Sequence, residues 1–207
     1  MSKKNTASGS RTLLLSVLMS APGPLVVGLG LLAGRSTTQI ADFVRRSAEL
    51  LAIIMSFVVY RITTKEACCE ERKATLEHRS NTFVGAMMCL GGIFMILLAF
   101  LSDNADKGNV IPGLAIALMG VIANTAFWIK YTRLNKKEPN AILQVQSRLY
   151  RAKALVDSCV TVALLSVLIL PDSPVSYWLD FAGSLIVAVY LIYSGVQVIL
   201  ESLKTIQ

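Results

Sequence analysis

The chain has 207 residues, of which 54% are hydrophobic, and a mean hydropathy of +0.60, whereas soluble domains carry about 45 to 50% apolar residues. This composition predicts an integral membrane protein that is long enough for several spanning helices but not for a sizeable soluble domain in addition. The formal net charge of +7 does not indicate a nucleic-acid partner, because the basic residues lie between the apolar runs, where membrane topology places them.

Six apolar runs predict six membrane-spanning helices behind a polar tail at residues 1–11. Each run has about the 20 residues that a helix needs to cross a bilayer. We therefore expect residues 12–207 to form an all-α transmembrane domain, a six-helix bundle with no soluble domain after it. The expected spans are 12–33, 38–60, 82–101, 110–129, 149–170 and 177–199.

The first run contains Pro22-Gly23-Pro24 near its middle. Proline lacks a backbone N–H and interrupts helical hydrogen bonding, so we expect a kink there. A signal peptide is the competing interpretation, because basic residues precede a short apolar core and Ser20-Ala21. The apolar character continues well past Ala21, which favours a membrane span.

The basic residues are distributed unevenly over the expected connectors. With six spans, the connectors alternate between the two sides of the membrane, and one side receives residues 1–11, 61–81 and 130–151 together with the C-terminus. These segments hold nearly all the connector lysines and arginines. By the positive-inside rule we expect a multi-pass protein of the plasma (inner) membrane with both termini in the cytoplasm.

Two short charged strings lie inside the otherwise apolar second and fifth spans. Arg45 and Glu49 are four residues apart in the first string, and Lys153 and Asp157 are four apart in the second. On a helix this spacing places both members of a pair on one face. Ionisable groups at membrane depth cost about 2.5 to 3.5 kcal/mol each, so they are candidates for a functional site.

The two carboxylates are expected at the same depth in the membrane. Glu49 and Asp157 each lie about 13 residues from the outer end of their span, or roughly 20 Å. Because the second and fifth spans run antiparallel, Arg45 should face Asp157 and Glu49 should face Lys153. Two cations and two anions sum to zero, as burial in a medium of low dielectric constant demands.

This charged quartet has two interpretations. It can be a transport site at the bilayer midplane, where carboxylates exchange a substrate ion for protons. If a metal ion binds there, Glu49 and Asp157 are its ligands, because Arg45 and Lys153 offer no lone pair. The alternative is a helix lock, in which the quartet joins two helices and carries no substrate.

Three further polar residues lie in or beside the spans. Asn124 is the only side-chain amide of the fourth span and is a candidate hydrogen-bond partner for the quartet. Asp42 and Asp180 are candidates for an outward-facing aqueous route. No pair of nucleophile and base and no cofactor motif appears, so we expect neither enzymatic activity nor a bound cofactor.

Four short motifs resemble those of the transmembrane domain of the cation diffusion facilitator (cation efflux) family, over about residues 12–206. This family comprises zinc, manganese and iron efflux transporters. The motifs are Trp178-Leu-Asp180, Glu201-Ser-Leu-Lys204, Ile40-Ala41-Asp42 and Ala154-Leu-Val-Asp157-Ser158.

The resemblance implies a cation-diffusion-facilitator-like bundle, a homodimer and a set of ligand positions. By position, the four metal ligands of the family fall on Arg45, Glu49, Lys153 and Asp157, so two of them carry positive charges here. The implied function is proton-linked cation export by alternating access, with a proton or a divalent cation as cargo. A cation of lower charge, or a proton alone, suits this quartet better than zinc.

Two other functions stay open at this point. The scaffold could have lost its metal site and could move an anion or an organic solute, bound by Arg45 and Lys153. It could also be a structural or regulatory membrane subunit that transports nothing.

Overall fold

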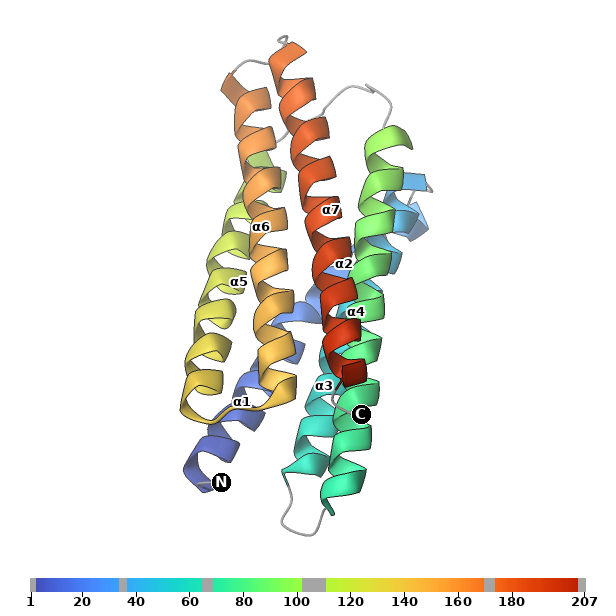
Figure 1. Ribbon diagram of the computed structural model, residues 1–207. Helices are drawn as coiled ribbons and strands as arrows, with labels where there is room; N and C mark the ends of the chain where they lie inside the picture. Colours follow the sequence, from blue (N-terminus) through green and yellow to red (C-terminus); the bar gives the residue numbers. More distant parts are fainter. Residues whose placement is uncertain (1–2, 34–36, 65–68, 102–110, 170–173, 205–207) are drawn as a thin grey trace.

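The computed structural model describes residues 3–33, 37–64, 69–101, 111–169 and 174–204 (Figure 1). Over these ranges the chain forms seven α-helices and no strand, so the all-α fold is confirmed. The helices are α1 (Lys3–Ser20), α2 (Pro22–Ala33), α3 (Thr37–Thr63), α4 (Glu70–Leu101), α5 (Ile111–Lys137), α6 (Ala141–Ile169) and α7 (Pro174–Lys204).

The first apolar run forms two helices, α1 and α2, separated by a break at Ala21. The Ala21 amide still donates to the Val17 carbonyl oxygen at 2.9 Å and closes the last turn of α1. Pro22 then starts α2, at a position where the missing N–H costs no helical hydrogen bond. The predicted kink is therefore a break between two helices.

The helices form an elongated bundle (Figure 1). α4 and α7 pack side by side in opposite directions, and so do α5 and α6. α3 packs against α4, and α1 and α2 lie against α3. α6 joins the two antiparallel pairs through its contacts with α7. This arrangement places α3 and α6, the two helices with charged strings, near each other inside the bundle.

Several helices extend beyond the expected spans at the end of the bundle where α1 begins, and α1 itself starts at Lys3, before residue 12. α4 begins at Glu70, well before residue 82, α5 continues to Lys137, and α6 begins at Ala141. The side-chain oxygen of Asn140 caps α6 by accepting hydrogen bonds from two amides of its first turn, at 3.0 and 3.2 Å. The apolar runs mark the membrane, whereas the helices continue into polar sequence.

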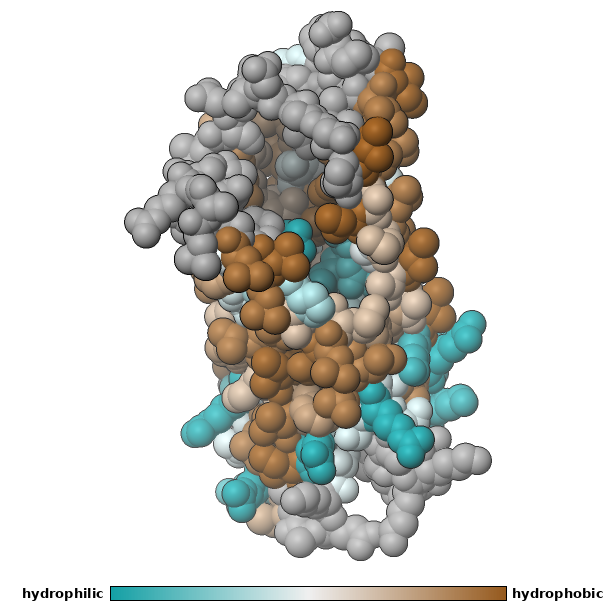
Figure 2. Space-filling model, turned by 180° about the vertical axis from the view of Figure 1, so that it is seen from behind, coloured by the Kyte–Doolittle hydropathy of each residue, from teal (hydrophilic) through white to brown (hydrophobic). Residues whose placement is uncertain are grey.

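The surface of the bundle is strongly hydrophobic over its middle, and hydrophilic side chains gather toward one end (Figure 2). Ile122 and Ile186, for example, expose 70% and 68% of their surface. Three stretches of the described chain are long and apolar enough to cross a membrane: Glu70–Phe100, Leu114–Lys137 and Phe181–Lys204. Apolar surface of this extent suits lipid chains rather than water, as expected of an integral membrane protein.

α4 and α7 approach each other closely at three glycines. A Cβ atom on Gly92 would lie 2.7 Å from the carbonyl oxygen of Ala188. A Cβ atom on Gly85 would lie 2.8 Å from the carbonyl oxygen of Gly195, and one on Gly195 would lie 2.6 Å from that of Gly85. Backbone atoms cannot turn aside as a side chain can, so these positions require glycine for the helices to pack at this separation.

We predict that Gly92→Ala destabilises the protein by about 1 to 3 kcal/mol, because the added methyl group forces α4 and α7 apart. Gly91→Ala is the matched control, since a Cβ atom there would meet only the Cγ atom of Arg45, at an ordinary 3.9 Å. Thermal unfolding of both variants in detergent measures the difference. Equal stability of the two variants would contradict the close packing of α4 on α7.

Candidate transport site

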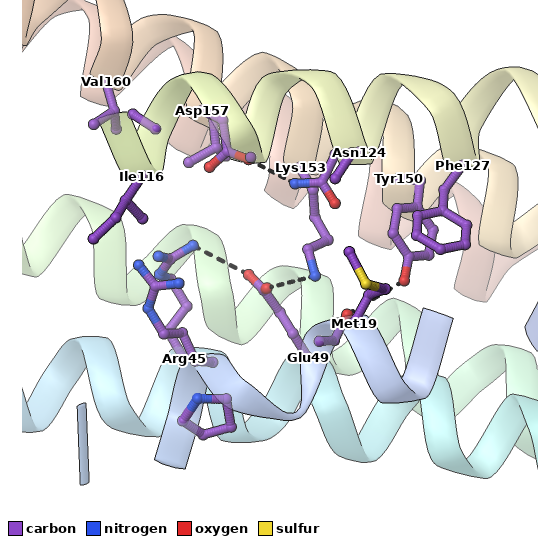
Figure 3. Close-up of a pocket in the computed structure, with 18 of the residues that line it drawn as sticks. Met19, Arg45, Glu49, Ile116, Asn124, Phe127, Tyr150, Lys153, Asp157 and Val160 are labelled. Carbon is purple, nitrogen blue, oxygen red and sulfur yellow. Dashed lines mark hydrogen bonds and ion pairs between the residues drawn. The ribbon is translucent and has the colours of Figure 1, made fainter. Parts of the chain in front are cut away.

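Glu49 lies at the centre of a cluster of charges between α3 and α6 (Figure 3). Nη1 of Arg45, one turn earlier on α3, lies 3.1 Å from Oε1 of Glu49. Nζ of Lys153, on α6, lies 3.3 Å from Oε2. Each of the three side chains exposes only 14 to 15% of its surface. Both carboxylate oxygens therefore have a cationic partner, and the predicted pairing of Glu49 with Lys153 is confirmed.

Asp157 is held by α5. Its Oδ2 atom accepts a hydrogen bond from Nδ2 of Asn124 at 2.6 Å, which is the contact expected for the lone amide of that span. Gly120 lies one turn before Asn124, and a Cβ atom there would come within 2.5 Å of the same oxygen. The missing side chain at position 120 thus provides the space that the Asp157 carboxylate occupies.

These groups surround a cavity of about 420 Å³ whose wall comes from α1, α2, α3, α5 and α6. Gly23 and Pro24, at the break between α1 and α2, form part of this wall. Arg45 and Asp157 lie on opposite sides of the cavity (Figure 3). The two residues therefore face each other as predicted, but Arg45 turns to Glu49 while Asp157 turns to the amide on α5.

Arg46 also lines the cavity, beside the four residues of the predicted quartet. The wall holds three cations, from Arg45, Arg46 and Lys153, and two anions, from Glu49 and Asp157. The prediction considered only residues four apart, yet Arg46 precedes Glu49 by three residues, and that spacing also brings two side chains to one helix face.

Aromatic side chains close part of the cavity beside α1. The ring of Tyr150 lies 5.0 Å from that of Phe127 and 5.4 Å from that of Tyr131, between centroids. Nζ of Lys153 lies 5.3 Å from the centroid of the Tyr150 ring, within the range of a cation–π contact. The Tyr131 hydroxyl lies 2.8 Å from Oγ of Ser16 and ties α5 to α1. The sequence prediction missed this group, although Tyr150 precedes Lys153 by one helical turn.

The structure brings five of the seven predicted site residues to this one cavity. They are Arg45, Glu49, Asn124, Lys153 and Asp157. The side chains of Asp42 and Asp180 lie outside the described residues, so their place in an aqueous route stays a prediction. Within the described part of the chain, no three His, Cys, Asp or Glu side chains gather as a metal site would require. Two carboxylates beside three cations do not fit the four ligands that zinc takes.

We predict an energetic coupling of about 1 to 3 kcal/mol between Glu49 and Lys153, because two neighbouring charges depend on each other when both are buried. A double-mutant cycle with Glu49→Gln and Lys153→Met, read by unfolding in detergent, measures it. The matched control is the more exposed pair of Arg148 and Glu201, 2.9 Å apart, for which the coupling should stay below about 1 kcal/mol. A coupling no larger than that of the control pair would rule out a strong buried contact.

A comparison with known families agrees with this architecture. Residues 13–206 match the family model of the cation efflux transmembrane domain. A search of curated proteins found no match. The family is one of membrane transporters of cations and not of enzymes. Because the match covers nearly the entire chain, this protein belongs to the cation efflux family.

Proposed function

We propose that this protein exports cations in exchange for protons by alternating access, and that Asp157 is the group that exchanges its partner. The different surroundings of the two cavity carboxylates carry this proposal. Glu49 has a cation on each oxygen, whereas Asp157 accepts its hydrogen bond from the neutral amide of Asn124. A proton or a cargo cation can therefore bind Asp157 without breaking an ion pair.

Arg45 and Lys153 act in this proposal as resident counter-charges for Glu49. A carboxylate buried without partners would lose several kcal/mol of hydration, so the two cations allow Glu49 to stay ionised at membrane depth. The three residues then form a fixed unit that links α3 to α6. Asp157 lies on the next turn of α6 after Lys153, outside this unit, and binds either a proton or the cargo cation.

The packing of the helices supports alternating access. α3 packs along α4 and α6 packs along α5, whereas α3 and α6 meet over a short stretch that includes the contact of Glu49 with Lys153. A change in the angle between the pair α3 and α4 and the pair α5 and α6 would open one side of the cavity and close the other.

The orientation and assembly form part of the same proposal. The lysines and arginines of the connectors support a protein of the plasma (inner) membrane with both termini in the cytoplasm, so that transport from that side is export. The family resemblance supports a homodimer.

Transport of an anion or an organic solute is the second candidate function. Arg46 favours it, because this residue gives the cavity wall a third cation. In that case Arg45, Arg46 and Lys153 would bind a negative group of the solute, and Asp157 would not exchange a proton.

Cation-driven proton movement into proteoliposomes that contain a pH-sensitive dye tests the leading proposal. We expect at least one cation from a series of metal, alkali and organic ions to drive proton flux through the wild-type protein. Asp157→Asn should reduce this flux at least tenfold, because the amide cannot take up a proton. Glu71→Gln is the matched control, since Glu71 is an exposed carboxylate in the first turn of α4.

Three results would contradict the proposal. Proton flux that persists in Asp157→Asn would assign the exchange to another group. Anion flux that is lost in Arg46→Gln would favour the second candidate function. If correctly folded protein transported none of the solutes, the result would favour the helix lock.

A further inference from the structure

We infer that the cargo is a monovalent organic cation of the ammonium type, bound at Asp157. The inference rests on the proposed exchange at that residue and names the class of substrate that the cavity fits. Three properties of the cavity lead to it: the charge of its wall, the contacts that its oxygen atoms already make, and its size and lining.

The charge of the wall favours a cargo with one positive charge. In the exchange, the Asp157 carboxyl releases its proton, and the resulting carboxylate pairs with the entering cation. One positive charge enters as one leaves, so the charge in the cavity is unchanged. A divalent ion exchanged for one proton would add one positive charge to a wall that already holds Arg45 and Lys153. Net charge is expensive at membrane depth.

The oxygen atoms of the wall suit an ammonium group better than a bare ion. Glu49 has a cation on each oxygen, and the hydroxyls of Ser20 and Tyr150 lie 3.4 Å from each other. A hard metal cation takes about six or more oxygen ligands, and Asp157 with Asn124 cannot supply that number. An ammonium cation needs only one carboxylate as its charge partner.

The size and lining of the cavity favour a cargo with an apolar body. Its volume of about 420 Å³ lies in the range of about 300 to 1,000 Å³ that is typical of small-molecule sites, and a bare ion would leave most of it unfilled. Ile116 and Val160 border the cavity near Asp157, while Phe127 and Tyr150 lie toward its other end (Figure 3). Aromatic faces attract organic cations, as the contact of Lys153 with Tyr150 already illustrates.

The test uses tetraethylammonium, a permanent cation that cannot cross a bilayer as a neutral base. Its binding to purified protein in weakly buffered detergent is followed by calorimetry and by proton release, alongside sodium and zinc. We expect about one proton released per tetraethylammonium bound, at least tenfold weaker binding in Asp157→Asn, and unchanged binding in Glu71→Gln. Sodium and zinc should release no protons.

A second measurement needs no variant and so does not depend on the folding of Asp157→Asn. Dicyclohexylcarbodiimide modifies protonated carboxyl groups in apolar surroundings, and mass spectrometry locates the modified residue. We expect modification at Asp157 that tetraethylammonium suppresses at least fivefold and that sodium and zinc do not.

The outcomes separate this inference from the proposed function. Proton release and protection of Asp157 by zinc or sodium, but not by tetraethylammonium, would overturn the organic cargo and leave cation exchange at Asp157 standing. Proton release by no cation, with folded protein, would overturn both.

Discussion

The structure depends on one constraint, which is that a carboxylate buried in the middle of a membrane protein must be neutralised where it lies. Glu49 meets this constraint with Arg45 from its own helix and Lys153 from α6, one on each oxygen. These contacts fix the register of α3 against α6 and set the level of the cavity. They also leave Asp157, one turn beyond Lys153, with an amide rather than a cation as its hydrogen-bond partner. The asymmetry between the two carboxylates is the basis of the functional proposal.

The family resemblance relates these charged residues to metal-ligand positions. The four positions that correspond by resemblance to metal ligands hold two carboxylates and two cations in this chain, and all four line one cavity. In the proposed function, Arg45 and Lys153 balance the charge of Glu49, and Asp157 exchanges one proton for one positive charge of the cargo.

Much of the fold could be predicted, because apolar runs and helical spacing are local properties of the sequence. The all-α bundle, the interruption at Pro22 and the contact of Glu49 with Lys153 all followed from them. The space for Asp157 beside Gly120 could not be predicted, because it depends on how closely α5 and α6 approach. The same is true of the glycine contacts between α4 and α7.

The role of Arg46 shows a different limit. Its spacing from Glu49 was visible in the sequence, but whether both of two adjacent arginines face a cavity depends on the rotation of α3 about its axis. That rotation is set by packing against α4 and by α1 and α2, which lie over α3. The start of α4 at Glu70 lies outside the apolar run for a simpler reason, since hydropathy reports the membrane and not the helix.

The most direct measurement of the central claim is infrared difference spectroscopy of the carboxyl groups, with and without the transported cation. We predict that cation binding removes the absorption of one protonated carboxyl in the wild-type protein and in Glu49→Gln. We predict no such change in Asp157→Asn. A change that persists in Asp157→Asn but disappears in Glu49→Gln would contradict exchange at Asp157 and make Glu49 the exchanging group.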